Sequence, residues 1–157
     1  MDLEYEKGNF RFSARVSAII YNKDKSKVLL FKVEDGRDYY LLPGGRIEIN
    51  EDSKDAIKRE IKEELNFDLQ FDLCAVQENF IKKDNKNIMQ YCFCYHAIHN
   101  QEIDKDSIRC LDSDGQSFHW VNINDIDNII VLPKSSKDLI KNKNTCIKHI
   151  IEKDIIV

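Results

Sequence analysis

The stretch from Pro43 to Phe67 constrains this chain most, because two adjacent glycines lead into a helix that is rich in carboxylates. On a helical wheel of about 100° per residue, the apolar side chains of this helix form one stripe: Ile57, Ile61 and Leu65. Glu64 lies within or beside that stripe, Glu60 lies on its border, and Glu63 lies further round. Since the stripe must face the core, the sequence predicts at least one partly buried carboxylate.

Glu60 and Glu64 also form a like-charge pair four residues apart, which costs a few tenths of a kcal/mol on an isolated helix. Partly buried carboxylates that repel one another need a positive charge between them, and a divalent metal ion is the simplest one. Gly44 and Gly45 allow close approach of the main chain and leave a carbonyl free to point at the site. Carboxylate and carbonyl oxygens are hard ligands that suit Mg²⁺ or Mn²⁺.

An ordinary solvated helix is the alternative interpretation of these carboxylates. Its counter-charges would come from four basic residues of the same segment: Lys54, Lys58, Arg59 and Lys62. Acidic solvated faces are common, but these basic residues lie mostly on the other side of the wheel. The glycine pair before the helix also has no role in this alternative, so we favour the metal site.

The stretch resembles the Nudix box, whose pattern is G-x5-E-x7-R-E-U-x-E-E-x-G-U with U a bulky aliphatic residue. Gly45, Glu51 and the run R-E-I-K-E-E-L-N-F from Arg59 to Phe67 match every fixed position except one. Asn66 stands where the family has glycine, and Phe67 is an aromatic variant of the last U. Asn is the next most tolerant residue in the left-handed conformation at a helix end, so we expect the chemistry to be intact.

The resemblance implies a metal-dependent hydrolase that cleaves the diphosphate linkage of a nucleoside diphosphate derivative or nucleoside triphosphate, with water attacking phosphorus. It implies Mg²⁺, for which Mn²⁺ can substitute, and a nucleotide-type small molecule as partner. The main alternative is a Nudix-fold module that binds or senses a nucleotide without hydrolysing it. Such a module would be expected to lose box carboxylates, and this chain keeps them. An interaction domain with an acidic helix leaves the glycine spacing unexplained.

The resemblance also implies roles for individual residues of the box. Four groups would hold the metal: Glu60, Glu63, Glu64 and the carbonyl of Gly44. The implied catalytic set is Glu63, Glu64, Arg59 and Glu51. Within it, Glu63 is a ligand or a nearby base. Arg59 and Glu51 are expected to pair and orient the helix against the glycine loop, because a guanidinium fork matches a carboxylate.

Residues outside the box are weaker candidates for contacts with substrate. Arg37, near the glycine loop, is a candidate for pairing with a phosphate, although a solvated turn arginine is the simpler interpretation. Tyr39 is a candidate for stacking on a nucleobase, although aromatic residues on strands more often belong to the core. The box does not specify the general base. Asp114 and Glu78 are candidates for the general base, although an ordinary surface acid is the simpler interpretation of each.

Length and charge limit the remaining function classes. At 157 residues the chain predicts one domain, 1–157, that buries roughly 70% of its unfolded surface. A net charge of −4 argues against binding to long nucleic acid or a membrane surface. The acidic N-terminus and the lack of a long apolar run predict neither a secretory signal nor a membrane span. Five cysteines without a CxxC pair predict reduced thiols in the cytoplasm. A homodimer is left open.

Periodicity and turn signals predict the elements. We expect strands over 10–21, 28–33, 39–42, 68–81, 88–98 and 118–123, with a turn at 82–87 and a loop at 99–117. The main helix should begin near Glu51 to Ser53, capped by Asp52 or Ser53. A helical turn is expected at 126–130, and one or two helices over 135–154. This order predicts an α/β fold, and the resemblance implies a Nudix-type α/β/α sandwich with a mixed β-sheet between helices.

Overall fold

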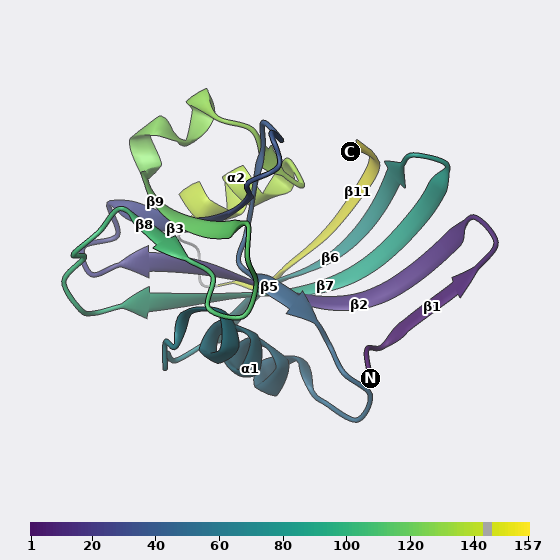
Figure 1. Ribbon diagram of the computed structural model, residues 1–157, viewed down its shortest axis with the longest axis horizontal. Coiled ribbons are helices and arrows are strands. Elements are labelled where there is room, and N and C mark those ends of the chain that lie inside the picture. The colour runs from purple at the N-terminus through teal and green to yellow at the C-terminus, as the bar shows by residue number, and fades with distance from the viewer. Residues whose placement is uncertain (143–145) are drawn as a thin grey trace.

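The computed structural model describes residues 1–142 and 146–157. A mixed β-sheet lies between two helical layers (Figure 1). Helix α1 (Ser53–Leu65) covers one face, and helix α2 (Ser135–Lys141) with the 3-10 helix η1 (Ile123–Asn128) covers the other. The predicted α/β/α sandwich is therefore confirmed.

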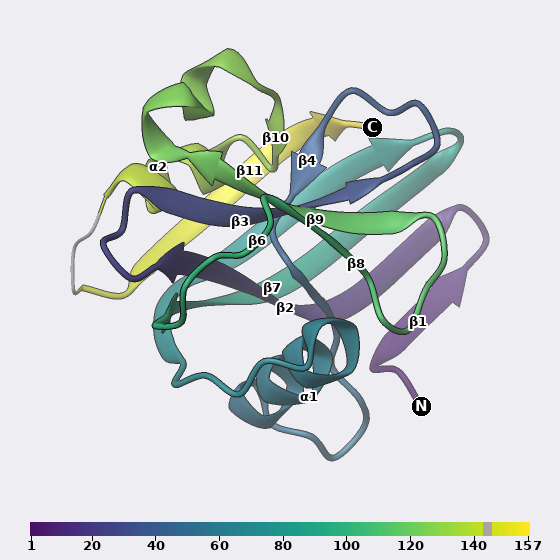
Figure 2. The same ribbon diagram turned by 60° about the vertical axis from the view of Figure 1, so that its left-hand side comes forward.

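Within the described residues the sheet has eleven strands: β1 (Glu4–Lys7), β2 (Phe10–Asn22), β3 (Lys27–Val33), β4 (Tyr40–Leu41), β5 (Gly44–Arg46), β6 (Asp72–Lys83), β7 (Lys86–His99), β8 (Ser107–Arg109), β9 (Gln116–Asn122), β10 (Val131–Leu132) and β11 (Lys148–Ile156). Its main path runs β10-β4-β3-β2-β7-β6-β11. The long central strand β2 pairs in parallel with β7 and antiparallel with β1 and β5 (Figure 2). Strand β9 pairs with β3, and β8 pairs with β9.

The sheet has a separate hydrophobic core on each face. Helix α1 contributes its buried stripe to one core: Ala56, Ile57, Ile61 and Leu65. Trp120 belongs to the same core. Cys94 lies in the second core with α2, and Cys92 is also buried. The two cores hold the helices in fixed positions relative to β2 and β5.

Both ends of α1 follow the sequence-based expectation. Asp52 caps the start, and its Oδ1 accepts hydrogen bonds from the main-chain N–H groups of Lys54 and Asp55, each at 2.9 Å. Asn66 ends the helix in the left-handed conformation, with φ 56° and ψ 30°, and its N–H donates to the Lys62 carbonyl at 3.0 Å. Asn66 therefore adopts the left-handed conformation that is expected of the family's glycine.

The expected C-terminal helix over 135–154 is wrong beyond α2. Strand β11 follows instead and runs parallel to β6 along the edge of the sheet. Residues 143–145 of the expected helix lie outside the described residues. The segment is rich in β-branched side chains that favour a strand: Ile150, Ile151, Ile155 and Ile156. The free edge of β6 supplies the main-chain partners that satisfy its hydrogen bonds.

Other differences concern boundaries and short strands. Residues 68–71 precede β6 rather than belong to it, and β6 and β7 extend until only Asp84 and Asn85 form the turn. Asp84 has a φ of 52°, a conformation that aspartate tolerates, so a tight turn replaces the longer expected one. The expected loop over 99–117 contains β8, and the 3-10 helix begins at Ile123 rather than 126. In the described part of the chain, no helix has the length and apolar character needed to span a membrane.

Candidate active site

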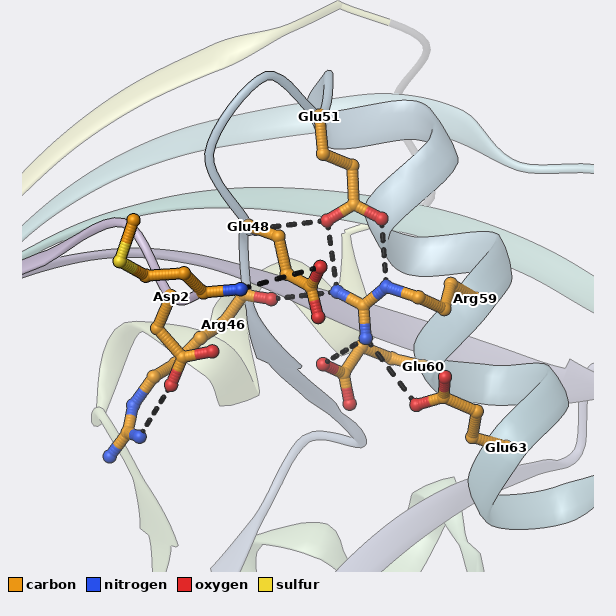
Figure 3. Close-up of polar contacts among 8 residues, drawn as sticks. Asp2, Arg46, Glu48, Glu51, Arg59, Glu60 and Glu63 are labelled. Carbon is orange, nitrogen blue, oxygen red and sulfur yellow. Dashed lines mark hydrogen bonds and ion pairs between the residues drawn. The ribbon is translucent and has the colours of Figure 1, made fainter.

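Arg59 of α1 lies at the centre of a network of carboxylates (Figure 3). Its guanidinium donates to both oxygens of Glu51, Nε to Oε1 at 2.8 Å and Nη2 to Oε2 at 2.9 Å. This bidentate contact is the pairing that the sequence predicts. The hydrogen bonds from Arg59 lower the pKa of Glu51 and raise that of Arg59 itself, so both groups stay charged.

The remaining donors of Arg59 join the helix to β5. Nη1 donates to Glu60 Oε1 at 2.9 Å and reaches Glu63 Oε2 at 3.4 Å, while Nη2 donates to the carbonyl of Arg46 at 3.0 Å. Figure 3 shows Glu60 and Glu63 on the same side of the guanidinium, away from Glu51. Arg59 therefore fixes the helix against the glycine strand, as a residue that positions metal ligands would.

The carboxylate of Glu60 is seated against Gly45. A Cβ atom built on Gly45 would overlap that carboxylate, so any larger residue would move Glu60 from its present position. The side chain of Glu60 is only 15% exposed, and burial raises its pKa despite the hydrogen bond from Arg59. Gly45 is thus required by the position of an acidic group, which explains its place in the motif.

Glu64 is the most deeply buried carboxylate of the helix, at 8% exposure, and lies next to the core as predicted. Its Oε2 is inaccessible and has no hydrogen-bond partner among the residues that the structure describes. Burial raises the pKa of Glu64 to about 8, and the charges of Glu60 and Asp112 add to the effect. A buried carboxylate with an unpaired oxygen fits a divalent cation, because the cation would remove all of these penalties together.

The sequence-based reasoning missed two further residues beside Glu64. Atoms of Glu64, Cys110 and Asp112 that can ligate a metal all lie within 4.8 Å of one another. The loop that carries Cys110 and Asp112 is attached to the end of α1, because the main-chain N–H of Leu111 donates to the Glu64 carbonyl at 2.9 Å. No local pattern in the sequence marks this loop, since the contact bridges parts of the chain far apart.

Gly44 brings the backbone of β5 directly onto β2. A Cβ atom on Gly44 would overlap the carbonyl of Val16, and its φ of 150° also favours glycine. Gly44 pairs with Ser17 in the sheet and lines a cavity on the other side of β5 from Glu60. The two glycines therefore connect the acidic cluster with this cavity.

The cavity has a volume of about 300 Å³ and a basic lining, although three of its arginines, Arg11, Arg37 and Arg46, are paired with acids outside the lining. Five cationic side chains line it: Arg11, Arg15, Arg37, Arg46 and Lys83. Among the described residues, no aspartate or glutamate lines it. Arg15 has no ion-pair partner within the described chain, and burial lowers its pKa. A basic cavity in a chain of net charge −4 is suited to a polyanionic ligand.

Much of the cavity wall is built from polar residues at alternate positions of strands. Strand β2 contributes Arg11, Ser13, Arg15 and Ser17, and β6 contributes Gln77 and Asn79. The period of two is visible in the sequence, and polar residues at every second place of an otherwise apolar strand are the signal that sequence reasoning overlooked. Asn79 Oδ1 and Ser136 Oγ have no hydrogen-bond partner in the described part of the chain.

The structure places both sequence-predicted substrate contacts on this cavity. Arg37 and Tyr39 line it together with Gly44. Arg37 Nη1 donates to the Tyr39 hydroxyl at 3.2 Å, and its Nε lies 2.7 Å from Asp35 Oδ2. Arg37 is thus held in place by an exposed acid that does not line the cavity.

The two candidate bases outside the box lie elsewhere. Glu78 Oε2 lies 2.6 Å from His149 Nε2, and strand alternation puts Glu78 on the opposite face of β6 from Gln77 and Asn79. Asp114 is exposed in the turn between β8 and β9. Asp112, two residues earlier, is the acid of this loop that lies beside Glu64.

Comparisons with known proteins agree with this geometry. The family model described as NUDIX domain matches residues 11–142. A sequence comparison with curated proteins finds no match.

Several solved structures share the fold. The MutT protein of Bacillus halodurans is 17% identical, with 90% of each chain covered and a TM-score of 0.66. The dihydroneopterin triphosphate pyrophosphohydrolase of E. coli is 20% identical over 82% of this chain and 92% of that one, with a TM-score of 0.59. The MutT protein of Methanosarcina mazei Go1 is 21% identical over 83% and 91%, with a TM-score of 0.55. At these identities the likeness shows the fold alone.

Proposed function

The chain belongs to the Nudix hydrolase family, and we propose that it is a metal-dependent enzyme that hydrolyses a diphosphate linkage in a nucleotide-type substrate. The observation that carries the proposal is the buried Glu64, whose Oε2 has no partner in the described chain although Glu60 and Asp112 add further negative charge. A purely structural helix would not keep such a cluster, because each uncompensated buried charge costs stability.

The proposed metal ligands are the carboxylates of Glu60, Glu63 and Glu64 and the carbonyl of Gly44, to which we add Asp112 from the neighbouring loop. These are hard oxygen donors, so we propose Mg²⁺, with Mn²⁺ as a substitute. When bound, such an ion neutralises phosphate charge and lowers the pKa of a coordinated water.

The chain's own residues have separable roles in this proposal. Arg59 holds Glu60 in place from one side and receives its own orientation from Glu51 on the other. Glu63 is 49% exposed, and as the alternative to its role as a ligand we propose it as the base that accepts a proton from the attacking water. Asp112, whose carboxylate lies within 4.8 Å of Glu64, is a second candidate for this base if it does not hold the metal.

We propose that the substrate occupies the basic cavity with its diphosphate at β5. Arg15 and Arg37 would contact phosphate oxygens, and Tyr39 would pack against the attached group. Arginine suits this task because its planar fork binds phosphate through two hydrogen bonds. One structural neighbour is named a pyrophosphohydrolase of a triphosphate, which favours including nucleoside triphosphates among the substrates tested.

We place the enzyme in the cytoplasm as part of the same proposal. The five cysteines are all free, and one of them, Cys146, is exposed. Free thiols without disulfide partners are typical of a reducing compartment.

The proposal is tested with a panel of nucleoside triphosphates, nucleoside diphosphate sugars, ADP-ribose and dinucleoside polyphosphates, assayed for phosphate and pyrophosphate release. Each substrate is measured with Mg²⁺, with Mn²⁺ and with excess chelator. We expect turnover of at least one substrate with either metal and none with chelator. Binding of a nucleotide without turnover under any condition would favour the sensing module instead.

A further inference from the structure

We propose that Cys110 gives this chain a mixed sulfur and oxygen site, formed with Glu64 and Asp112, that takes a softer divalent cation of the Zn²⁺, Co²⁺ or Cd²⁺ type. The inference rests on the proposed function only in sharing Glu64 with the proposed Mg²⁺ site. It adds a ligand atom that the hydrolase chemistry itself does not require.

The three side chains converge from two separate parts of the fold. Glu64 comes from the last turn of α1, and Cys110 and Asp112 come from the loop after β8. Their ligand atoms lie within 4.8 Å of one another, and Cys110 Sγ lies 2.9 Å from Asp112 Oδ1. The 2.9 Å contact is a hydrogen bond that the thiol donates, so a cation with bonds of about 2.3 Å to sulfur and about 2.0–2.2 Å to oxygen would replace that proton and lengthen the contact.

Main-chain contacts hold the three residues together without a cation. The N–H of Leu111 donates to the Glu64 carbonyl at 2.9 Å, and the N–H of Cys110 donates to the Gln116 carbonyl at 3.0 Å. The first bond attaches the loop to the helix, and the second closes the turn that leads into β9. The position of the thiol beside the carboxylates is therefore a property of the backbone and is preorganised for binding.

Glu64 provides the independent indication of a ligand. It is more than nine-tenths buried, and its Oε2 has no partner among the residues described. Cys110 is itself 8% exposed, so its sulfur faces Glu64 and Asp112 rather than bulk water. The Cys110 thiol donates its hydrogen bond to the exposed Asp112, so the buried Oε2 of Glu64 is left without a donor among the residues described.

Binding follows a balanced exchange. The Cys110 S–H bond breaks, its proton goes to solvent, and a sulfur–metal bond forms, with no change of oxidation state. Sulfur is a poor ligand for Mg²⁺ but a good one for Zn²⁺ and its analogues. The mixed donor set therefore predicts that softer ions bind here more tightly than Mg²⁺ and compete with it for Glu64.

Co²⁺ is the direct probe, because a thiolate ligand produces a charge-transfer absorption band in the near ultraviolet that oxygen ligands do not. We expect the band on titration of the complete chain with CoCl₂. We expect its loss in Cys110→Ser and its retention in Cys146→Ser, which removes the exposed thiol most available for adventitious binding. In competition with Cd²⁺, Cys110→Ser should bind at least about tenfold more weakly, since even residues that only support a ligand cost 10- to 100-fold.

Absence of the band in the parent chain, or its persistence in Cys110→Ser, would overturn the proposal. If Cys110→Ser does not fold, Glu64→Gln serves instead and should weaken the band. X-ray absorption of the Co²⁺ complex of the parent chain should then show one sulfur neighbour, and none would refute the site. A chain that hydrolyses substrates with Mg²⁺ but shows no band refutes this inference alone. A Cys110-dependent band in a chain that hydrolyses nothing refutes the proposed function alone.

Discussion

At the scale of single residues, the site is defined by carboxylates whose burial costs folding free energy. Glu64 is buried with an unpaired oxygen, while Glu63, one residue earlier on the same helix, is 49% exposed. The two glutamates differ in environment and not in chemistry, so they form a matched pair. Any penalty that burial imposes should appear at Glu64 and be absent at Glu63.

Glu64→Gln is expected to stabilise the metal-free protein at pH 8 by roughly 1–3 kcal/mol, because it removes a buried charge and keeps the side-chain volume. In the parent, the folded state holds the Glu64 proton with a pKa of about 8 against an ordinary value of 4.5. The folded state therefore binds the extra proton between these values, and stability falls as pH rises from about 4.5 to about 8.

The measurement is urea unfolding in chelator across that pH range for the parent, Glu64→Gln and Glu63→Gln. In Glu64→Gln the free energy of unfolding should fall less with rising pH than in the parent, and in Glu63→Gln it should fall as in the parent. A loss of stability in Glu64→Gln at every pH would mean that the carboxylate is a structural group, in conflict with our interpretation.

Arg59→Lys tests whether the guanidinium fork positions the ligands. Lysine keeps the charge but cannot contact both oxygens of Glu51 and reach Glu60 at the same time. We expect metal affinity to fall by about 10- to 100-fold, the usual cost of removing a group that orients a ligand. Isothermal titration with Mn²⁺ measures it, and Lys58→Arg on the exposed face is the control. Unchanged affinity would show that Arg59 acts only in packing.

At the scale of elements, the site is the junction of β5 with α1. The strand presents Gly45 to Glu60 and the Arg46 carbonyl to Arg59. The helix is fixed in turn by its apolar stripe and by its caps. A change at the junction should therefore disturb the acidic cluster while the two cores remain intact.

Gly45→Ala should lower metal-dependent turnover by roughly a hundredfold, because a Cβ atom would displace the Glu60 carboxylate by an ångström or so. It should also destabilise the fold by about 1–3 kcal/mol through overpacking. In a Glu60→Ala background the same substitution should cost less than about 1 kcal/mol, because the overlapping atoms are gone. A double-mutant cycle of unfolding free energies measures this coupling, and additive effects would contradict the proposed contact.

Asn66→Gly tests the end of α1. Glycine relieves the left-handed strain at φ 56° but adds freedom to the unfolded chain, so stability should stay within about 0.5 kcal/mol of the parent. Alanine lacks both the conformational freedom of glycine and the tolerance of asparagine for the left-handed conformation. Asn66→Ala should therefore lower the free energy of unfolding by about 1 kcal/mol. Thermal unfolding distinguishes the two. Activity of Asn66→Gly should match the parent, and a large loss would show that Asn66 contacts substrate or metal.

At the scale of the whole molecule, the sequence predicts best those structural features that depend on neighbouring residues. The cap at Asp52 and the left-handed Asn66 were both predictable, because each depends on neighbours within one helix turn. The burial of Glu64 followed from the wheel, and the pairing of Arg59 with Glu51 followed from the family resemblance.

Features that depend on distant contacts were not predictable in this way. Strand β11 forms because it can pair with the edge of β6. The residues of β11 alone do not show that this edge is available. Cys110 and Asp112 reach Glu64 only through the fold. Residues of β2, β5 and β6 together line the basic cavity. Of this arrangement, only the alternation of polar residues along a strand can be recognised in the local sequence.

Glu64 is, in our proposal, a carboxylate kept for catalysis with a metal, and the rate of Mg²⁺-dependent hydrolysis by Glu64→Gln is the sharpest test of that role. The variant is compared with the parent on the best substrate of the panel at saturating Mg²⁺. We predict a loss in kcat of about a thousandfold, equal to ~4 kcal/mol of transition-state stabilisation, in a protein that remains folded. A folded Glu64→Gln with a kcat near that of the parent would contradict the account.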